Sequence, residues 1–321
     1  MAHDGGKGPT AKIWRDGVLV DWADATIHVL AHSVHYGSSV FEGVRCYEGP
    51  NGAGAVFRLR DHMRRLHDSA KIYRLETKYS IDDMVSAVVE TVAANELTEC
   101  YIRPLVMRSG EQMGIWSKDI PVETFIICYR WPTLLGAAAV ESGADVRVSS
   151  WRRAAPDTFP TLAKAGGNYL NSQLSAMEAR LDEYAEGIML DSNGWVAEGS
   201  GQNLFVVRDN TLYTAPISSG ILHGITRDSV MKMGVDLGYE VKEMVLPREF
   251  LYIADEAFFC GTAAELTPIR SIDQLPVGNG KVGPITRKLQ EQYMGIVRGT
   301  IPGRTGWLTP VPVAEPAASG R

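Results

Sequence analysis

The sequence predicts an α+β protein with two domains. Its 321 residues suit about two domains of roughly 150 residues each. Predicted helices and strands alternate as far as Trp131, whereas strands predominate in the second half. The small-residue run at 133–139 is typical of an interdomain linker. We therefore expect a disordered N-terminus at 1–10, a first domain at 11–130, a linker at 131–139, a second domain at 140–307 and a disordered tail at 308–321.

The first domain is expected to begin with a β-hairpin, because strands at Lys12–Arg15 and Val18–Val20 flank the turn Asp16-Gly17. A helix is predicted over Asp61–Tyr73, where apolar residues recur three and four positions apart and Asp61 can cap the first turn. The other expected elements are a helix at Ile81–Asn95 and strands at Tyr101–Met107 and Thr124–Trp131.

Two helices of the second domain are predicted from their ends. One runs over Ile225–Leu237 and stops at Gly238, the usual residue after a helix C-terminus. Another begins at Pro284, which suits a first helical turn, and continues to about Val297. The remaining expected elements are a helix at Asn168–Tyr184 and strands at Asp145–Trp151, Gly187–Asp191, Gly194–Glu198, Asn203–Val207, Thr211–Thr214, Glu256–Cys260 and Leu266–Ile272.

Composition excludes several classes of partner. The net charge of −6 argues against a nucleic-acid partner, which usually meets a basic face. The four cysteines form no Cys-x-x-Cys pair, so we expect reduced thiols in a cytoplasmic protein and no metal site. The N-terminus has no apolar signal region, and no stretch approaches the roughly 20 apolar residues of a membrane span. We therefore expect no membrane partner.

Lys164 is the first candidate functional residue. It is the only lysine between Lys118 and Lys232, and its neighbours are small or apolar. A lysine in an apolar setting has a lowered pKa because its charged form is poorly solvated. An uncharged amine is the form that makes a Schiff base with an aldehyde cofactor. The alternative is an ordinary loop lysine beside the Gly166-Gly167 turn, and this stretch alone leaves both open.

A carboxylate and two backbone segments add to this candidate site. Glu198 ends a predicted strand and precedes Gly-Ser-Gly, so it could keep the nitrogen of a flat ring protonated; the alternative is an exposed strand-end glutamate. Thr226 opens a helix whose first N–H groups can bind phosphate. The segment Gly261–Ala264 offers a second small-residue backbone after a strand. Together with Lys164, these features indicate an aldehyde cofactor that carries a phosphate.

Two other motifs are weaker. Residues 278–283 spell G-x-G-x-x-G, but no βαβ unit starts there, so we expect a glycine-rich turn before a helix rather than a dinucleotide site. Gly199-Ser200-Gly201 lacks the G-x-S-x-G spacing of a hydrolase nucleophile.

Several motifs in fixed order resemble the class IV, or fold-type IV, pyridoxal-phosphate aminotransferases, and are most similar to the bacterial branched-chain amino-acid aminotransferases. The resemblance extends from about Ile13 to Leu308. The segments that carry it are His35–Gly37, Val40–Tyr47, His62–His67, Tyr101–Pro104, Ala163–Tyr169, Glu198–Phe205, Gly224–Arg227 and Gly261–Glu265.

The resemblance implies a small α/β domain, a larger barrel-like α/β domain and pyridoxal 5'-phosphate between them, near a dimer interface. It implies that Lys164 forms the Schiff base, that Glu198 pairs with the ring nitrogen and that Tyr169 binds the ring hydroxyl. The other implied cofactor contacts are Leu222 on the ring and Arg65, Ile225, Thr226 and Thr262 on the phosphate. The implied substrate-binding residues are Tyr36, Phe41, Arg45, Arg103, Trp131, Leu134, Thr262 and Ala263.

The implied activity is ping-pong transamination of L-leucine, L-isoleucine and L-valine with 2-oxoglutarate, by a homodimer or a hexamer. The alternatives are a D-amino-acid or (R)-amine transaminase, an aminodeoxychorismate lyase and a phosphate-ligand binding module without catalysis. The sequence departs from the family pattern at Leu134, Gln202 and His223, where tyrosine, glutamate and proline are expected. We interpret the last two as tolerated, whereas Leu134 removes a hydroxyl from the implied pocket and should affect its substrate range.

Overall fold

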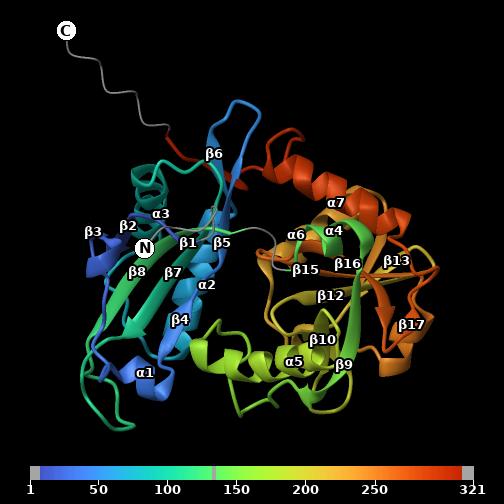
Figure 1. Ribbon diagram of the computed structural model, residues 1–321, viewed down its shortest axis with the longest axis horizontal. Coiled ribbons are helices and arrows are strands. Elements are labelled where there is room, and N and C mark those ends of the chain that lie inside the picture. The colour runs from blue at the N-terminus through green and yellow to red at the C-terminus, as the bar shows by residue number, and fades with distance from the viewer. Residues whose placement is uncertain (1–7, 132–134, 313–321) are drawn as a thin grey trace. The chain divides into compact units, whose positions relative to one another are not determined.

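The computed structural model describes residues 8–131 and 135–312, and the chain divides into two compact units (Figure 1). Unit 1 comprises residues 1–131 and 295–321, and unit 2 comprises residues 132–294. Within the described residues, each unit is built on its own nine-stranded sheet. None of the described helices combines the length and the apolar character that crossing a bilayer would need.

The sheet of unit 1 is antiparallel, with the strand order β18-β6-β5-β7-β8-β2-β3. Helices α2 and α3 pack against each other, and α2 buries Leu59, Met63 and Leu66. The elements of this unit are β1 (Gly8–Pro9), β2 (Lys12–Arg15), β3 (Val18–Asp21), η1 (Trp22–Asp24), α1 (His32–Tyr36), β4 (Ser39–Phe41), β5 (Val44–Glu48), β6 (Gly54–Phe57), α2 (Leu59–Ile72), α3 (Ile81–Ala94), β7 (Cys100–Arg108), β8 (Val122–Arg130) and β18 (Leu308–Pro310).

Local sequence explains most of these elements. The predicted hairpin forms, with Asp16 and Gly17 both at positive φ (43° and 97°) between β2 and β3. The expected cap at Asp61 is wrong. Helix α2 begins two residues earlier, after Arg58, and Asp61 instead accepts a hydrogen bond from Arg58 Nε at 2.6 Å. Helix α3 has the reciprocal capping box that the sequence Ser80 to Asp83 permits.

Unit 2 contains a closed barrel. Its strand order is β11-β10-β9-β16-β15-β12-β13-β14, and an extra pairing of β11 with β12 joins the two ends of the first six strands. The closing pair is Glu198 and Asn203. The strands of this unit are β9 (Ala144–Arg152), β10 (Glu186–Leu190), β11 (Val196–Gly199), β12 (Asn203–Arg208), β13 (Thr211–Thr214), β14 (Glu240–Glu243), β15 (Glu256–Gly261), β16 (Glu265–Ile272) and β17 (Leu275–Pro276).

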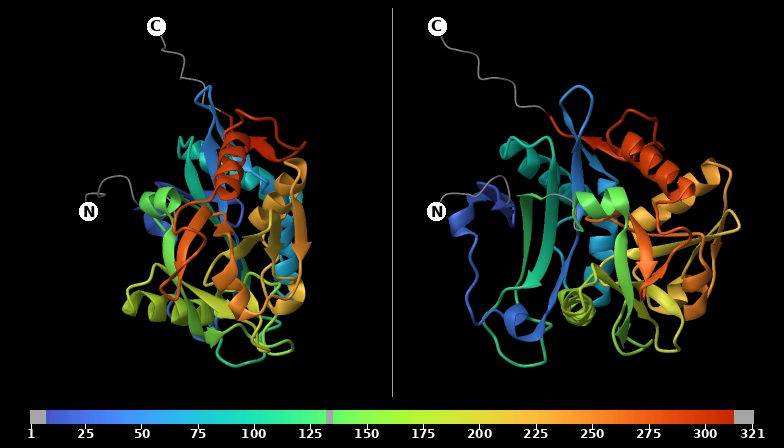
Figure 2. Two further views of the ribbon diagram at one scale, coloured as in Figure 1. Left: turned by 90° about the vertical axis from the view of Figure 1, so that its right-hand side faces the viewer. Right: turned by 45° about the vertical axis from the view of Figure 1, so that its right-hand side comes forward.

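Helices cover this barrel from outside. Helix α5 (Tyr169–Leu181) lies along β9 and β10, and α6 (Ile225–Asp236) contacts β14 and β15 (Figure 2). The main buried core of this unit includes the strand residues Val146, Ile188 and Phe259. The remaining helices are α4 (Ala137–Ser142), η2 (Gly166–Asn168), η3 (Ile217–Ser219), η4 (Arg248–Ile253) and α7 (Pro284–Val297), the last of which continues into unit 1.

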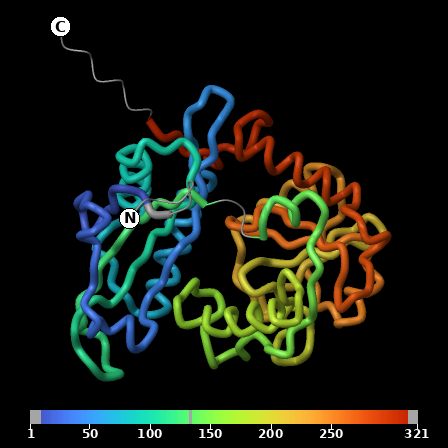
Figure 3. The backbone as a smooth tube through the Cα atoms, viewed as in Figure 1, coloured from blue at the N-terminus to red at the C-terminus, as the bar shows by residue number. Residues whose placement is uncertain are grey.

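The predicted segment boundaries differ from the structure in three places. Helix α4 lies partly within the expected linker. Residues 295–307 group with unit 1, although the second domain was expected to continue to 307. Leu308–Pro310 was expected to be disordered but pairs with β6 as strand β18, which Figure 3 shows as the returning end of the chain beside that strand. A strand of only three residues is too short to show a readable alternation, so no local signal marked it.

The structure explains why the G-x-G-x-x-G segment is only a turn. It leads into α7, and the buried carboxylate of Glu256 occupies the N-terminus of that helix. Glu256 accepts hydrogen bonds from the N–H groups of Ile285 (3.0 Å) and Thr286 (2.7 Å) and from Thr286 Oγ1 (2.6 Å). A Cβ at Gly283 would lie 2.0 Å from Glu256 Cδ, so glycine is required there. An internal anion thus takes the place that a phosphate would need.

We predict that Glu256→Ala destabilises unit 2, because three donors at the start of α7 lose their acceptor. The expected loss is about 3 kcal/mol, measured as a lower midpoint of urea unfolding. Glu249→Ala removes an exposed carboxylate from the same unit and is the matched control. Equal midpoints for the two variants would contradict the assigned role of Glu256.

Candidate active site

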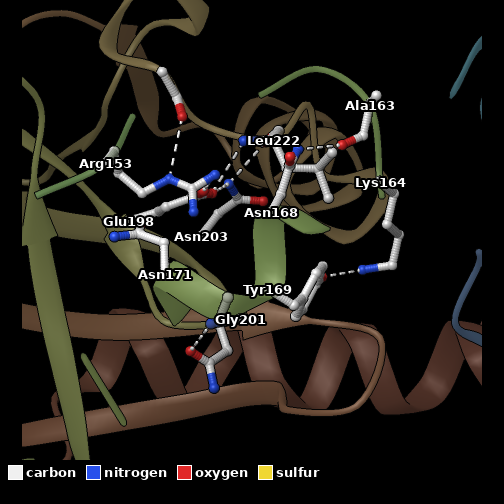
Figure 4. Close-up of polar contacts among 12 residues, drawn as sticks. Arg153, Ala163, Lys164, Asn168, Tyr169, Asn171, Glu198, Gly201, Asn203 and Leu222 are labelled. Carbon is white, nitrogen blue, oxygen red and sulfur yellow. Dashed lines mark hydrogen bonds and ion pairs between the residues drawn. The ribbon is translucent and has the colours of Figure 1, made fainter. Parts of the chain in front are cut away.

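The lysine segment is held in shape by side chain to backbone hydrogen bonds. Asn168 Nδ2 donates to the carbonyls of Pro160 (3.1 Å) and Ala163 (3.0 Å). Ala163 and Ala165 are buried, and Lys164 between them is partly buried. Lys164 Nζ donates to Tyr169 Oη at 2.5 Å (Figure 4). Helix α5 starts at Tyr169, so one short loop and one helical turn bring together the amine and the phenol that the sequence singled out.

Glu198 is a buried acceptor of three donors. Its side chain lies in the barrel wall, and the residue is only 5% exposed, so the alternative of an exposed strand-end glutamate is wrong. Oε1 contacts Arg153 Nη2 at 3.0 Å, and Oε2 accepts from Asn203 Nδ2 (2.9 Å) and from the Leu222 N–H (3.1 Å) (Figure 4). Burial raises the pKa of Glu198 above its usual value, and Arg153, the Leu222 N–H and Lys164 reduce that rise without cancelling it.

Asn203 links Glu198 to the start of helix α6. Its amide also donates to the Leu222 carbonyl at 3.0 Å, which fixes the segment before the helix. Gly224 follows, and a Cβ there would lie 1.9 Å from Asn203 Oδ1, so no larger residue fits. Ile225 and Thr226 form the first turn of α6, which has no side-chain cap. The first N–H groups of a helix without such a cap can bind an anion.

The second predicted backbone segment is the turn between β15 and β16. Cys260, at the end of β15, pairs with Asn203 of β12, so the turn that contains Thr262 and Ala263 continues from the same region of the barrel. Gly261 lies beside Gly201 and Gln202. The carboxylate, the helix start and this turn are thus carried by segments around the closure of the barrel, and Lys164 acts electrostatically on the same carboxylate.

In unit 1, Arg65 is held by a carboxylate that sequence reasoning missed. Arg65 Nε and Nη2 donate to the two oxygens of Glu42 at 2.6 and 2.8 Å, and His62 Nδ1 lies 2.7 Å from Glu42 Oε2. Glu42 is fully buried. Burial alone would raise the pKa of Glu42, but Arg65 and His62 outweigh it and hold that pKa well below its usual range. The segment Val40–Tyr47 was noted, but nothing local marked Glu42 as the partner of Arg65.

The predicted substrate residues of unit 1 form an aromatic and cationic cluster, with one addition. The Arg103 guanidinium lies 4.4 Å from the Phe41 ring centroid and donates to Tyr101 Oη at 3.1 Å. Tyr101 in turn meets the Trp131 ring edge-on at 5.0 Å. Arg45 Nη2 donates to the Trp131 carbonyl at 2.8 Å. Tyr101 was not predicted, although it stands two residues before Arg103 on β7 and therefore shares its face.

One predicted residue of unit 1 has other partners than this cluster. Tyr36 stacks on His32 in α1, with 4.4 Å between ring centroids, and its hydroxyl accepts a hydrogen bond from the Gly114 N–H. Leu134 lies outside the described residues.

Gln202, which stands where the family pattern has glutamate, is hydrogen-bonded to a buried carboxylate. Gln202 Nε2 donates to Glu186 Oε2 at 3.0 Å, and both side chains are buried. A glutamate at this position would place two carboxylates together in the core, which is costly unless one of them takes a proton. Gln202 is therefore matched to Glu186. His223 is exposed, in agreement with the interpretation that it is tolerated.

The residues of unit 2 fit pyridoxal 5'-phosphate. An amine held by a phenol suits its aldehyde and ring hydroxyl, a buried carboxylate suits its ring nitrogen, and a glycine-preceded helix start suits its phosphate.

Comparison with known proteins supports this fit. The family model described as "Amino-transferase class IV" matches residues 39–272. The branched-chain-amino-acid aminotransferase of Escherichia coli strain K12 is 50% identical over 304 residues, which cover 93% of this chain and 97% of the relative. The enzyme of the same name from Pseudomonas aeruginosa is 43% identical over 297 residues, covering 92% of this chain and 96% of the relative.

Solved structures agree with the sequence relatives. The crystal structure of the Escherichia coli branched-chain amino acid aminotransferase has a TM-score of 0.91 and 48% identity, covering 94% of this chain and 100% of that one. The branched-chain amino acid aminotransferase from Thermobaculum terrenum, solved in its PLP-form, has a TM-score of 0.88 and 37% identity, covering 95% of this chain and 99% of that one. These matches span both units, and the chain belongs to the class IV, pyridoxal-phosphate-dependent aminotransferases.

Proposed function

We propose that this chain is a branched-chain amino-acid aminotransferase that moves an amino group between L-leucine, L-isoleucine or L-valine and 2-oxoglutarate in a ping-pong cycle. The observation that carries the proposal is the Lys164–Tyr169 pair in the same unit as the buried carboxylate of Glu198, in a chain whose relatives bear this name at 50% identity.

The roles of the residues in unit 2 follow from their chemistry. Pyridoxal 5'-phosphate, when bound, supplies an electron sink that weakens the substrate α-C–H bond. Lys164 Nζ, oriented by Tyr169 Oη, binds the cofactor and later takes and returns the α-proton. Glu198 receives the ring nitrogen, and the first turn of α6 with Thr226 receives the phosphate. Arg65 and Thr262 as phosphate ligands, and Leu222 as a contact of the ring, stay predictions.

The cluster in unit 1 supports the choice of substrates. Trp131, which is 39% exposed and packs on the buried Tyr101, offers aromatic surface of the kind that suits an aliphatic side chain, whereas Arg103 offers the charge that a second carboxylate needs. An aliphatic amino acid and 2-oxoglutarate require these two properties in one enzyme. The effect of Leu134 on the substrate range stays a prediction from the sequence.

We further propose that the chain forms a homodimer through an apolar surface of unit 1. Ile115 and Trp116 are 92% and 78% exposed, and Val29, Val34 and Met113 are also exposed. The contacts of Gly114 with His32 and Tyr36 join the two segments that carry these side chains. Exposed apolar side chains on adjoining segments are typical of a surface that another protein covers. A second copy of the chain is the proposed occupant.

We also propose a cytoplasmic location. All four cysteines are free and buried, and free thiols suit a reducing compartment.

We expect the purified protein with pyridoxal 5'-phosphate to convert L-leucine and 2-oxoglutarate to the keto acid and glutamate, and to lose its yellow colour with L-leucine alone. D-leucine is the control substrate. Consumption of D-leucine alone would favour the D-amino-acid transaminase, and pyruvate released without an acceptor would favour the lyase. A protein that binds the cofactor but keeps its colour with either leucine would be a binding module.

We predict that Lys164→Ala lowers turnover on the order of 10³-fold or more, because the variant loses both the cofactor attachment and the proton carrier. Borohydride reduction of the parent, followed by peptide mass mapping, should place the cofactor on Lys164. Lys281→Ala changes an exposed lysine of the same unit and should leave the rate unchanged. Cofactor attached to another lysine would overturn the assignment.

We predict that Trp116→Glu converts the dimer to a monomer, because a charge replaces an exposed aromatic side chain at the proposed interface. Light scattering coupled to size exclusion measures the molar mass. Ile253→Glu, an exposed apolar position of unit 2, is the control and should remain dimeric. A parent protein that is already monomeric, or a Trp116 variant that stays dimeric, would reject this surface as the interface.

A further inference from the structure

Arg153 is a buried arginine that neither the sequence motifs nor the proposed roles include. It follows directly after β9, and only 8% of it is exposed. Its Nη2 lies 3.0 Å from Glu198 Oε1, and its Nε donates to the Gly220 carbonyl at 3.3 Å (Figure 4). Its backbone N–H donates to Leu190 O at 2.8 Å. The guanidinium is therefore held at two points and the backbone at a third, with one edge of the guanidinium turned to the carboxylate.

Burial of this pair is energetically costly. Two charges removed from water lose solvation, and replacement of such pairs by apolar residues often stabilises a protein. The neighbouring Arg152 shows the less costly alternative, because it is exposed and its Nη1 donates to the Ser192 carbonyl. A buried arginine against the carboxylate that receives the ring nitrogen is thus better explained by the chemistry of that carboxylate than by stability.

The other charged groups around Glu198 have other partners, so Arg153 is the one that can stabilise its charge. Lys164 and Arg227 act on the carboxylate electrostatically, and Cys260 faces it as a neutral thiol whose pKa burial raises. Arg227 is occupied by the Ala215 carbonyl and Glu243. Lys164 is committed to Tyr169 and to the chemistry of the proposed function. Among the described residues, Arg153 is the cation that the structure places in direct contact with Glu198.

We propose that Arg153 is a positioning residue that keeps Glu198 ionised, so that the proton shared between this carboxylate and the cofactor nitrogen resides on the nitrogen. The inference rests on the proposed function and deepens it. One proton lies between the two groups, and no other proton is gained or lost. If the proton lies on the carboxyl oxygen, the cofactor ring is neutral. If the proton lies on the nitrogen, the ring is the stronger electron sink.

The geometry favours the second arrangement. Arg153 on Oε1, with Asn203 and the Leu222 N–H on Oε2, stabilises the anionic form of Glu198 and lowers its proton affinity. An arginine remains charged across the whole working pH range, so its effect does not titrate away. Arg153 is the group that most strongly opposes the effect of burial on the pKa of Glu198. Without the guanidinium this pKa should rise further, and the carboxyl should then retain the proton.

The first test uses the protein without its cofactor. Infrared spectra of the parent, Arg153→Met, Arg153→Lys and the control Arg152→Met are recorded at neutral pH. We expect the carbonyl stretch of one protonated carboxyl in Arg153→Met, absent from Arg153→Met/Glu198→Gln, and no such band in the control. Arg153→Lys should restore the ionised form. If Arg153→Met shows no such band, the proposal is wrong.

The second test adds ¹⁵N-labelled pyridoxal 5'-phosphate and reads the ring nitrogen by NMR. We expect a protonated nitrogen in the parent and in Arg153→Lys, and a shift toward the neutral form in Arg153→Met. With L-leucine, kcat of the Met variant should fall at least tenfold while KM changes little. A nitrogen that stays protonated in a folded Arg153→Met would overturn the proposal. A parent that does not transaminate would reject the proposed function, while the infrared test would still report on Arg153 and Glu198.

Discussion

The buried carboxylate of Glu198 is the constraint around which unit 2 is organised. It belongs to the residue pair that closes the barrel, so its position is set by the whole ladder from β11 to β12. A buried anion must be surrounded by donors, and the Leu222 N–H and Asn203 come from segments that must therefore approach closely. Gly224 then permits the start of α6 to pack against Asn203. Closure, carboxylate and helix start depend on one another.

Unit 1 also contains a buried carboxylate that positions its neighbours. Glu42 lies between β4 and β5, and its two oxygens hold Arg65 and His62 of helix α2. A bidentate arginine pair fixes both the position and the plane of the guanidinium. Arg65 is thus presented in one orientation rather than as a mobile side chain. In both units, a buried acid determines where a cation or a donor stands.

The N-termini of two helices in unit 2, α6 and α7, differ in what satisfies their first N–H groups. Helix α7 starts against Glu256, whose carboxylate satisfies the first N–H groups and serves stability. Helix α6 starts after Gly224 and has no side-chain cap, which suits an external anion. The G-x-G-x-x-G motif before α7, taken alone, would predict the phosphate site at α7 rather than at α6. The difference arises from one acidic residue that β15 contributes.

The sequence by itself determined the periodic helices, the hairpin at Asp16-Gly17 and the family, because these depend on local propensity and on motifs in fixed order. It also predicted roles for Lys164 and Tyr169, which one helical turn brings into contact. Only the tertiary structure decided the partners of buried charges, such as Arg153 with Glu198 and Glu42 with Arg65. Those pairs join segments far apart in the chain, and no local pattern records which strands become neighbours. The same reason explains the cap wrongly expected at Asp61 and the strand β18 that was expected to be disordered, since Arg58 and β6 are the partners that decide each case.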